Sequence, residues 1–118
     1  MHNSPARVTA LVLGVVFGLI GALGFTASDE EWLFRILSVN VAQNVLHLVI
    51  GAALVVIAFS KRAPLLDAIV GTLLLATGIA GLFMISTPSN VIAVNGAANL
   101  LHFVGAAVLL AVGLGARR

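Results

Sequence analysis

Residues 39–52, VNVAQNVLHLVIGA, and residues 94–107, VNGAANLLHFVGAA, are near copies of each other within one very apolar chain. Both copies place two asparagines and a histidine at the same spacing: Asn40, Asn44 and His47, and then Asn95, Asn99 and His102. At 100° per residue, each set of three lies within about 60° of arc on a helix, which is one face. The repeat therefore predicts two helices that carry the same polar stripe.

The composition decides which solvent surrounds these helices. Hydrophobic residues make up 61% of the 118 residues and charged residues only 8%, values that are typical of membrane proteins and not of soluble domains. Cysteine is absent, so disulfides, thiolate catalysis and cysteine-bound metals are excluded. The net charge of +2 comes with no basic run longer than a pair, so we expect no nucleic-acid partner. The chain belongs in a lipid bilayer.

Four apolar segments are each near the ~20 residues that cross a hydrocarbon core as a helix. They are residues 8–25, 41–59, 65–85 and 97–114. Backbone groups in lipid must bond to one another, and the segments lack the alternation of barrel strands, so helices are favoured. The first apolar run is too long for a cleaved signal peptide. The sequence predicts an all-α membrane protein, a single domain over residues 1–118 that forms a four-transmembrane-helix bundle.

The bundle is predicted to consist of two tandem helical hairpins, over about residues 8–60 and about residues 64–115. Each hairpin has an even number of spans, so both copies insert in the same direction, as a parallel repeat about an axis along the membrane normal. Glycines spaced on one face let neighbouring helices approach closely. The glycines expected at these contacts are Gly14, Gly18, Gly21, Gly51, Gly71 and Gly78.

The basic residues predict an orientation. All except Arg35 fall on one side of the predicted spans: Arg7, Lys61, Arg62, Arg117 and Arg118. Positive loops stay in the cytoplasm, so both termini are expected there and residues 29–38 and 86–94 are expected outside.

The first outer loop is predicted to form a short interfacial helix over residues 28–37. Ser28 and Glu31 have the spacing of a capping box, and bulky apolar residues follow them. Three side chains are candidate anchors in the headgroup layer: Trp32, Phe34 and Arg35. A docking surface for a partner is the functional alternative for this segment.

Asp67 is the one acidic residue within the apolar segments. We expect it at the cytoplasmic interface near Lys61 and Arg62, with a place in a proton path as the alternative. The sequence contains no nucleophile paired with a base, no phosphate-binding loop and no metalloprotease helix, so the chain is not expected to be an enzyme.

The paired stripe has two main interpretations. Its side chains can form interhelical hydrogen bonds that set which helices pair, which predicts no cofactor and no bound metal. The chain would then be a structural or accessory subunit, self-associated or attached to a larger membrane assembly. Alternatively, His47 and His102 converge on haem b or another metal ion, or line a path for a small solute or a proton. A contact with lipid or with a partner helix is the third possibility.

The motifs resemble those of small bacterial four-helix membrane proteins, the domain of unknown function 4383 family. The first segment ends in LGF at residues 23–25, the second starts with NVLHL at residues 44–48, and the fourth opens with VN at residues 94–95 before Asn99 and His102. The resemblance covers almost the whole chain. It implies a multi-pass protein of the bacterial plasma membrane with four spans, and it implies no established activity.

Overall fold

The computed structural model describes residues 4–26, 32–33, 37–38, 40–90 and 94–115. Four long helices account for most of them: α1 (Ser4–Gly24), α2 (Val41–Ala58), α3 (Ala63–Met84) and α4 (Gly96–Gly115). The shortest helix has 18 residues and the longest 22, so each is about 27–33 Å long, close to the thickness of a hydrocarbon core. The predicted all-α chain of four long apolar helices is confirmed.

Side chains cap the starts of two helices, α2 and α4. The Asn40 side chain accepts a hydrogen bond from the Gln43 backbone N–H at 2.8 Å, and Asn95 accepts one from Ala98 at the same distance. Each asparagine satisfies a backbone donor that the first helical turn leaves without a partner. Pro64 lies in the first turn of α3, where its missing N–H costs nothing.

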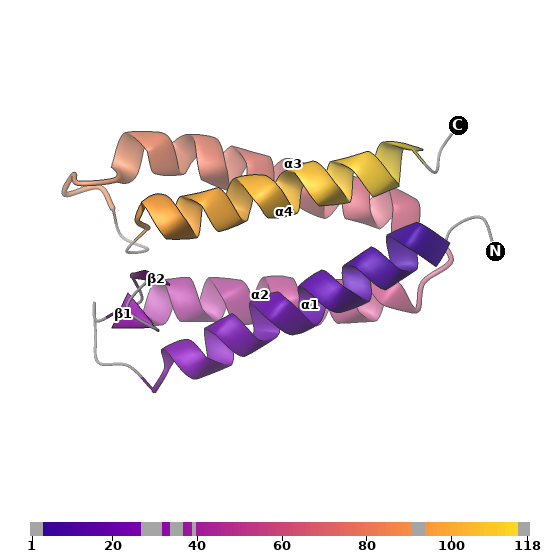
Figure 1. The fold of residues 1–118 in the computed structure, drawn as a ribbon, viewed down its shortest axis with the longest axis horizontal. Helices are drawn as coiled ribbons and strands as arrows, with labels where there is room; N and C mark the ends of the chain where they lie inside the picture. The colour runs from indigo at the N-terminus through magenta and orange to yellow at the C-terminus, as the bar shows by residue number, and fades with distance from the viewer. Residues whose placement is uncertain (1–3, 27–31, 34–36, 39, 91–93, 116–118) are drawn as a thin grey trace.

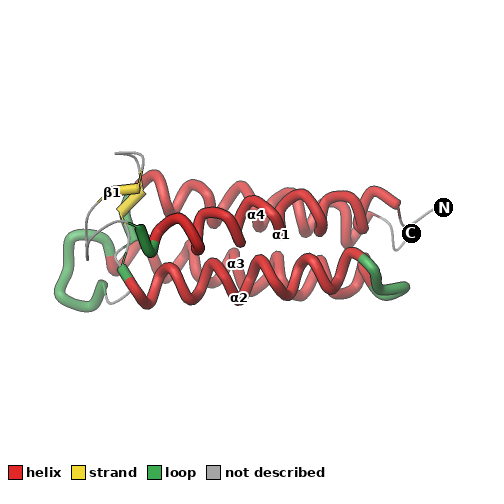
Figure 2. The backbone as a smooth tube through the Cα atoms, turned by 90° about the horizontal axis from the view of Figure 1, so that it is seen from below, coloured by secondary structure: helices red, strands yellow, loops and turns green. Residues whose placement is uncertain are grey.

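The helices pack as two hairpins, in which α1 lies along α2 and α3 lies along α4 (Figure 1). Packing within each hairpin is far more extensive than packing between them. The view turned by 90° shows α1 beside α4 and α2 beside α3, which completes a compact bundle (Figure 2). We call the end with the α2–α3 turn, residues 59–62, the turn end. The opposite end, where α2 and α4 begin, is the loop end.

The exterior of the bundle is apolar on every helix. Large side chains that are more than half exposed include Leu19, Val56, Phe83 and Leu100, one from each helix. A soluble monomer rarely exposes so much continuous apolar surface, and all four helices are long and apolar enough to cross a membrane. The chain is therefore a multi-pass membrane protein with four candidate spans.

The interior contains one large, fully buried apolar side chain from each helix. These four residues, which we call the central apolar cluster, are Phe17, Leu54, Leu74 and Leu109. Toward the turn end the same core continues with small side chains: Ala6, Ala10, Ala58 and Ala63. The change from large to small residues shows that α1 and α3 present their alanines to the interior at the turn end.

The α1–α2 contact brings backbone against backbone. A Cβ atom added at Gly51 would contact the backbone nitrogen of Gly18 and would lie 2.7 Å from the carbonyl oxygen of Gly14. A Cβ atom at Gly21 would lie 2.7 Å from the backbone nitrogen of Leu48. Gly18 differs from the other glycines of this contact, because a Cβ atom there would meet nothing within 4 Å.

The α3–α4 contact is built differently. A Cβ atom at Gly71 would lie 3.0 Å from the Leu110 side chain, and one at Gly78 would lie 3.0 Å from the Phe103 ring. Here a side chain of α4 fills the space that each glycine leaves. At these two positions the second hairpin has adjustable side chains where the first hairpin has backbone. At Gly113 of α4, however, a Cβ atom would again meet backbone, that of Pro64 and Ala68 on α3.

The predicted interfacial helix over residues 28–37 is wrong. Trp32–Leu33 forms strand β1 and Leu37–Ser38 forms strand β2, which pair antiparallel. A helix of ten residues is marginal on its own, whereas aromatic and bulky apolar residues favour strands, and pairing supplies partners for the backbone. Phe34 and Arg35 lie outside the described residues, as do Ser28 and Glu31, so the predicted capping box does too.

Candidate functional site

The two repeated histidines meet inside the bundle, in its loop-end half. His47 comes from α2 and His102 from α4, and their side chains are 1% and 0% exposed. The two Nε2 atoms lie 3.4 Å apart, and the ring centroids lie 5.6 Å apart at an interplanar angle of 59°. The pair therefore joins the two hairpins through a long hydrogen bond between their rings.

A chain of hydrogen bonds extends from this pair into α3. Asn99 Nδ2 donates to the carbonyl oxygen of Gly78 at 2.9 Å, and Asn99 Oδ1 lies 3.4 Å from His102 Nδ1. The carbonyl of Gly78 can only accept, so the amide nitrogen of Asn99 must face it and the amide oxygen must face the ring. This orientation assigns the roles of the ring nitrogens: His102 Nδ1 donates, and His102 Nε2 accepts from His47 Nε2.

Several polar atoms in the first copy of the motif have no hydrogen-bond partner among the described residues. Both amide atoms of Gln43, the amide oxygen of Asn44 and Nδ1 of His47 are buried without a hydrogen-bond partner in the described part of the chain. The assignment above makes His47 Nδ1 an acceptor that faces no donor. A buried polar atom without a partner costs about 1–3 kcal/mol, so these atoms are a local cost to the packing of the first hairpin.

Two glycines make room for the two buried asparagines. A Cβ atom at Gly81 would overlap the Asn99 amide, and one at Gly24 would overlap the Asn44 amide. The sequence shows both glycines at the ends of their apolar segments, but only the packed helices reveal that each one faces an asparagine.

The predicted polar stripe divides into two groups. Asn44, His47, Asn99 and His102 are buried, whereas Asn40 and Asn95 are partly exposed at the starts of their helices and act as caps. Gln43 belongs to the buried group but was not singled out from the sequence. Its position one helical turn before His47, on the same face, is the signal that could have identified it.

An apolar wall closes the site toward the turn end. The Phe17 ring packs against His47, with ring centroids 5.6 Å apart at 57°. A Cβ atom at Gly105 would touch both Phe17 and Leu74, at 3.3 Å. The central apolar cluster therefore begins directly beneath the histidine pair.

Asp67 lies inside the bundle, in the second turn of α3. It is fully buried, and both of its carboxyl oxygens lack a hydrogen-bond partner among the described residues. Its helix face explains the burial: Ala63 lies one turn before it and Gly71 one turn after it, and both are buried. A face made of small residues turns inward and carries the acid with it. Its place at the cytoplasmic interface near Lys61 and Arg62 stays a prediction.

The geometry of the histidine pair bears on metal binding. A metal held between two imidazoles on opposite sides, as a haem iron is, would keep the two nitrogens about 4 Å apart if each bond is about 2.0 Å, whereas His47 and His102 Nε2 are 3.4 Å apart. Within the described residues, no three ligating side chains come together to hold a metal ion. The distance therefore fits a direct hydrogen bond between the rings better than it fits a haem iron between them.

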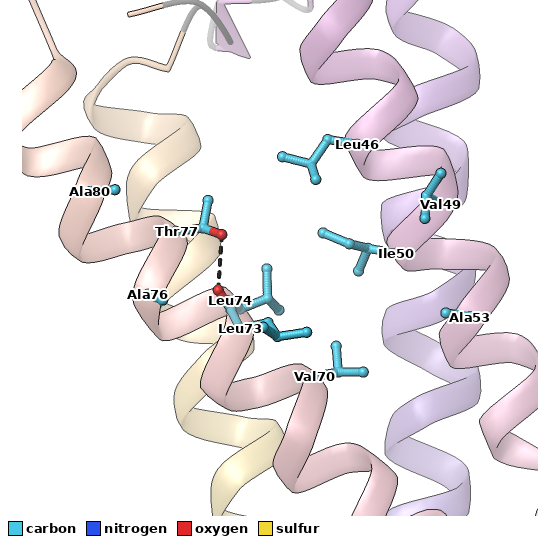
Figure 3. Close-up of a pocket in the computed structure, with 10 residues that line it drawn as sticks. All are labelled: Leu46, Val49, Ile50, Ala53, Val70, Leu73, Leu74, Ala76, Thr77 and Ala80. Carbon is cyan, nitrogen blue, oxygen red and sulfur yellow. Dashed lines mark hydrogen bonds between the residues drawn. The ribbon is translucent and has the colours of Figure 1, made fainter. Parts of the chain in front are cut away.

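An apolar groove opens on the outside of the bundle between α2 and α3. Its volume is about 570 Å³. Figure 3 shows Leu46 and Ile50 of α2 directed toward Val70 and Leu73 of α3 across the groove. Thr77 brings the one hydroxyl group, and it donates to the Leu73 carbonyl oxygen at 2.9 Å (Figure 3). The groove therefore offers an apolar surface with no free hydrogen-bond donor.

Comparison with known proteins places the chain in a family. No curated protein and no solved structure matches it. The family model described as domain of unknown function DUF4383 matches residues 7–115, which include almost all of α1 and the whole of the other three helices. The chain belongs to the DUF4383 family, as its paired asparagine and histidine motifs predicted.

Proposed function

We propose that the protein is a non-enzymatic membrane subunit that acts through contacts between its helices and those of a second copy or of a larger membrane assembly. The groove between α2 and α3 is the observation that carries this proposal, because it is apolar, open to the outside and about 570 Å³ in volume. Bundles in membranes associate by packing side chains into such gaps between helices. The polar groups that could perform chemistry are instead buried in the interior, away from the groove.

The proposed setting is the bacterial plasma membrane with both termini in the cytoplasm. Arg7 in the first turns of α1 and the pair Lys61 and Arg62 lie at the same end of the bundle, and Arg7 Nε donates to the Ala58 carbonyl oxygen at 3.0 Å. Basic residues gathered at one end support a cytoplasmic turn end. The two hairpins are proposed to be parallel copies of one unit, which the matching positions of His47 and His102 support.

The association can be tested by filling the groove. Ala76 lines the groove on α3, so Ala76→Trp should block it. Ala111→Trp is the matched control, because Ala111 is exposed on α4 and does not line the groove. We expect the wild type and Ala111→Trp to purify in mild detergent as the same oligomer or with the same stoichiometric membrane protein, and Ala76→Trp to lose that partner. A monomeric wild type without a partner would contradict the proposal.

The second candidate function is a ligand site at the histidine pair. The observation in its favour is that His47 Nδ1 and the Gln43 amide face no donor or acceptor within the described residues. The visible spectrum and metal content of the purified protein should be recorded beside the His47→Ala/His102→Ala double variant. The proposed subunit role predicts a colourless, metal-free protein. A Soret band or a stoichiometric metal ion that the double variant loses would establish the cofactor site instead.

A further inference from the structure

A buried carboxyl group lies in the turn-end half of the bundle, apart from the histidine pair. Asp67 is 0% exposed, and neither of its oxygens has a hydrogen-bond partner in the described part of the chain. The position 57 residues earlier, which the glycine repeat pairs with it, is the fully buried Ala10. The first hairpin therefore has a methyl group where the second hairpin has an acid.

The surroundings of Asp67 offer little to an ionised carboxylate. Its helix face carries Ala63 and Gly71, one turn to each side. An ionised carboxylate in such surroundings costs several kcal/mol unless a cation or several donors compensate it. Asp67 has neither among the described residues, so binding a proton is the simplest way to remove the charge.

The charged groups at this end come from two elements. On α1 the basic group is Arg7, and its Nε atom already donates to the Ala58 carbonyl oxygen at 3.0 Å. Lys61 and Arg62 precede α3, and Arg62 occupies its N-cap position without a side-chain capping bond. Helix α4 has no charged or titratable group in its turn-end half, between the buried His102 and Gly115. The described residues therefore include three basic groups near this end, and none of them forms a hydrogen bond with either Asp67 oxygen.

A metal cation fits this position poorly. Hard cations take six or more oxygen ligands, whereas the residues next to Asp67 and one turn away on its helix have no polar side chain. The nearby Thr72 hydroxyl donates to the Ala68 carbonyl oxygen at 2.8 Å. A single carboxyl group without further oxygen ligands is suited to bind a proton.

The histidine pair cannot exchange this proton directly. Leu74 lies seven residues beyond Asp67 on α3, which is about 10 Å along the helix, and belongs to the central apolar cluster. Phe17, from the same cluster, packs beneath His47. The apolar cluster therefore separates Asp67 from the loop-end half, and only the turn end is left for exchange with water.

We propose that Asp67 is a proton-binding site within the membrane, neutral in the packed bundle, which exchanges its proton with water at the turn end. This site is independent of the groove and of the proposed association.

Infrared spectroscopy of the protein reconstituted in lipid tests the site directly. We expect the wild type at pH 7 to show the carbonyl band of a protonated carboxylic acid, and Asp67→Asn to lose it while keeping its helix content. The band should shift in heavy water, which would demonstrate exchange. The matched control replaces the three other acids by Asp29→Asn, Glu30→Gln and Glu31→Gln, and it should keep the band. Carboxylate bands alone in the wild type would overturn the proposal.

Chemical labelling gives a second readout. Dicyclohexylcarbodiimide is apolar and reacts with protonated carboxyl groups, so mass spectrometry should find it on Asp67. A water-soluble carbodiimide should label the same residue at least tenfold less. Equal labelling by both reagents would show a carboxyl group open to water, and it would overturn the proposal. Because the infrared band needs no reagent to reach the site, a wild type with the band but no label still supports the proton site.

Discussion

In the α3–α4 hairpin, the amide of Asn99 bonds to Gly78 and faces His102, whereas the oxygen of Asn44, at the same place in the α1–α2 hairpin, has no partner among the described residues. The two hairpins carry the same asparagine and histidine, so the residue types do not explain the difference. The helix contacts do differ at matching positions: a Cβ atom at Gly21 of α1 would meet the backbone of Leu48, whereas one at Gly78 of α3 would meet the Phe103 ring. The comparison teaches that helix packing decides which copy of a repeated polar motif is bonded.

The largest expected effect is on the backbone contact of the first hairpin. Gly51→Ala places a methyl group against the backbone of Gly18, and overpacking of this kind costs about 1–3 kcal/mol. Gly18→Ala is the matched control, because a Cβ atom there meets nothing within 4 Å. We expect the thermal unfolding temperature in detergent to be clearly lower for Gly51→Ala and unchanged for Gly18→Ala. Equal losses in both variants would mean that the two helices cross differently.

The bonded and open asparagines should respond unequally to truncation. Asn99→Ala removes the bond to Gly78 and the contact with His102, and interhelical hydrogen bonds in membranes are worth about 0.6 kcal/mol on average and up to about 1.7 kcal/mol. Asn44→Ala removes an oxygen without a partner, so its cost should be smaller. Denaturant titration of both variants checks the difference. A larger loss for Asn44→Ala would contradict the assigned bonds.

A smaller effect of opposite sign is expected at Gln43. Gln43→Met keeps the volume of the side chain but removes two buried amide atoms that have no partner in the described residues. Removing such atoms should stabilise the bundle by about 1 kcal/mol, and the corresponding position on α4 is already an apolar residue, Ala98. Thermal unfolding in detergent measures the change. A loss of stability would show that the amide has a partner, such as a bound water or solute.

The last prediction concerns which ring nitrogen carries the proton in each histidine, and it needs no change in stability. The hydrogen-bond directions place the proton of His102 on Nδ1 and that of His47 on Nε2. Nitrogen-15 spectra of histidine-labelled protein should therefore show one ring of each tautomer. Asn99→Ala should release His102 from this constraint and leave His47 as the internal control. Two identical tautomers in the wild type would contradict the chain of bonds.

The fold could be predicted from the sequence because the bilayer leaves few choices. Apolar runs of span length must be helices, and the four observed helices begin and end within four residues of the predicted limits. The pairing of the histidines also follows from their equal spacing in two helices. By contrast, the strands at Trp32–Leu33 and Leu37–Ser38 form in a segment where helix and strand preferences compete.

The burial of Asp67 and the buried, unpartnered amide of Gln43 could be found only from the structure. Both depend on how far each helix is rotated about its axis, and one residue of error, about 100°, would turn either side chain toward lipid. The alanine and glycine on either side of Asp67 carry the relevant signal. A charged residue near a span end nevertheless favours the interface as the first expectation, since ionised groups avoid the bilayer interior.

The bond between His47 and His102 joins residues 55 positions apart, whereas most packing lies within each hairpin. At 5–20 residues per second, the ribosome needs roughly 3–11 s to add the second histidine after the first. The α1–α2 hairpin can therefore enter the bilayer and close before its partner exists, with one imidazole still lacking its counterpart. The order of synthesis thus creates a half-assembled species that lives for seconds, and insertion factors or a second chain have that long to meet it.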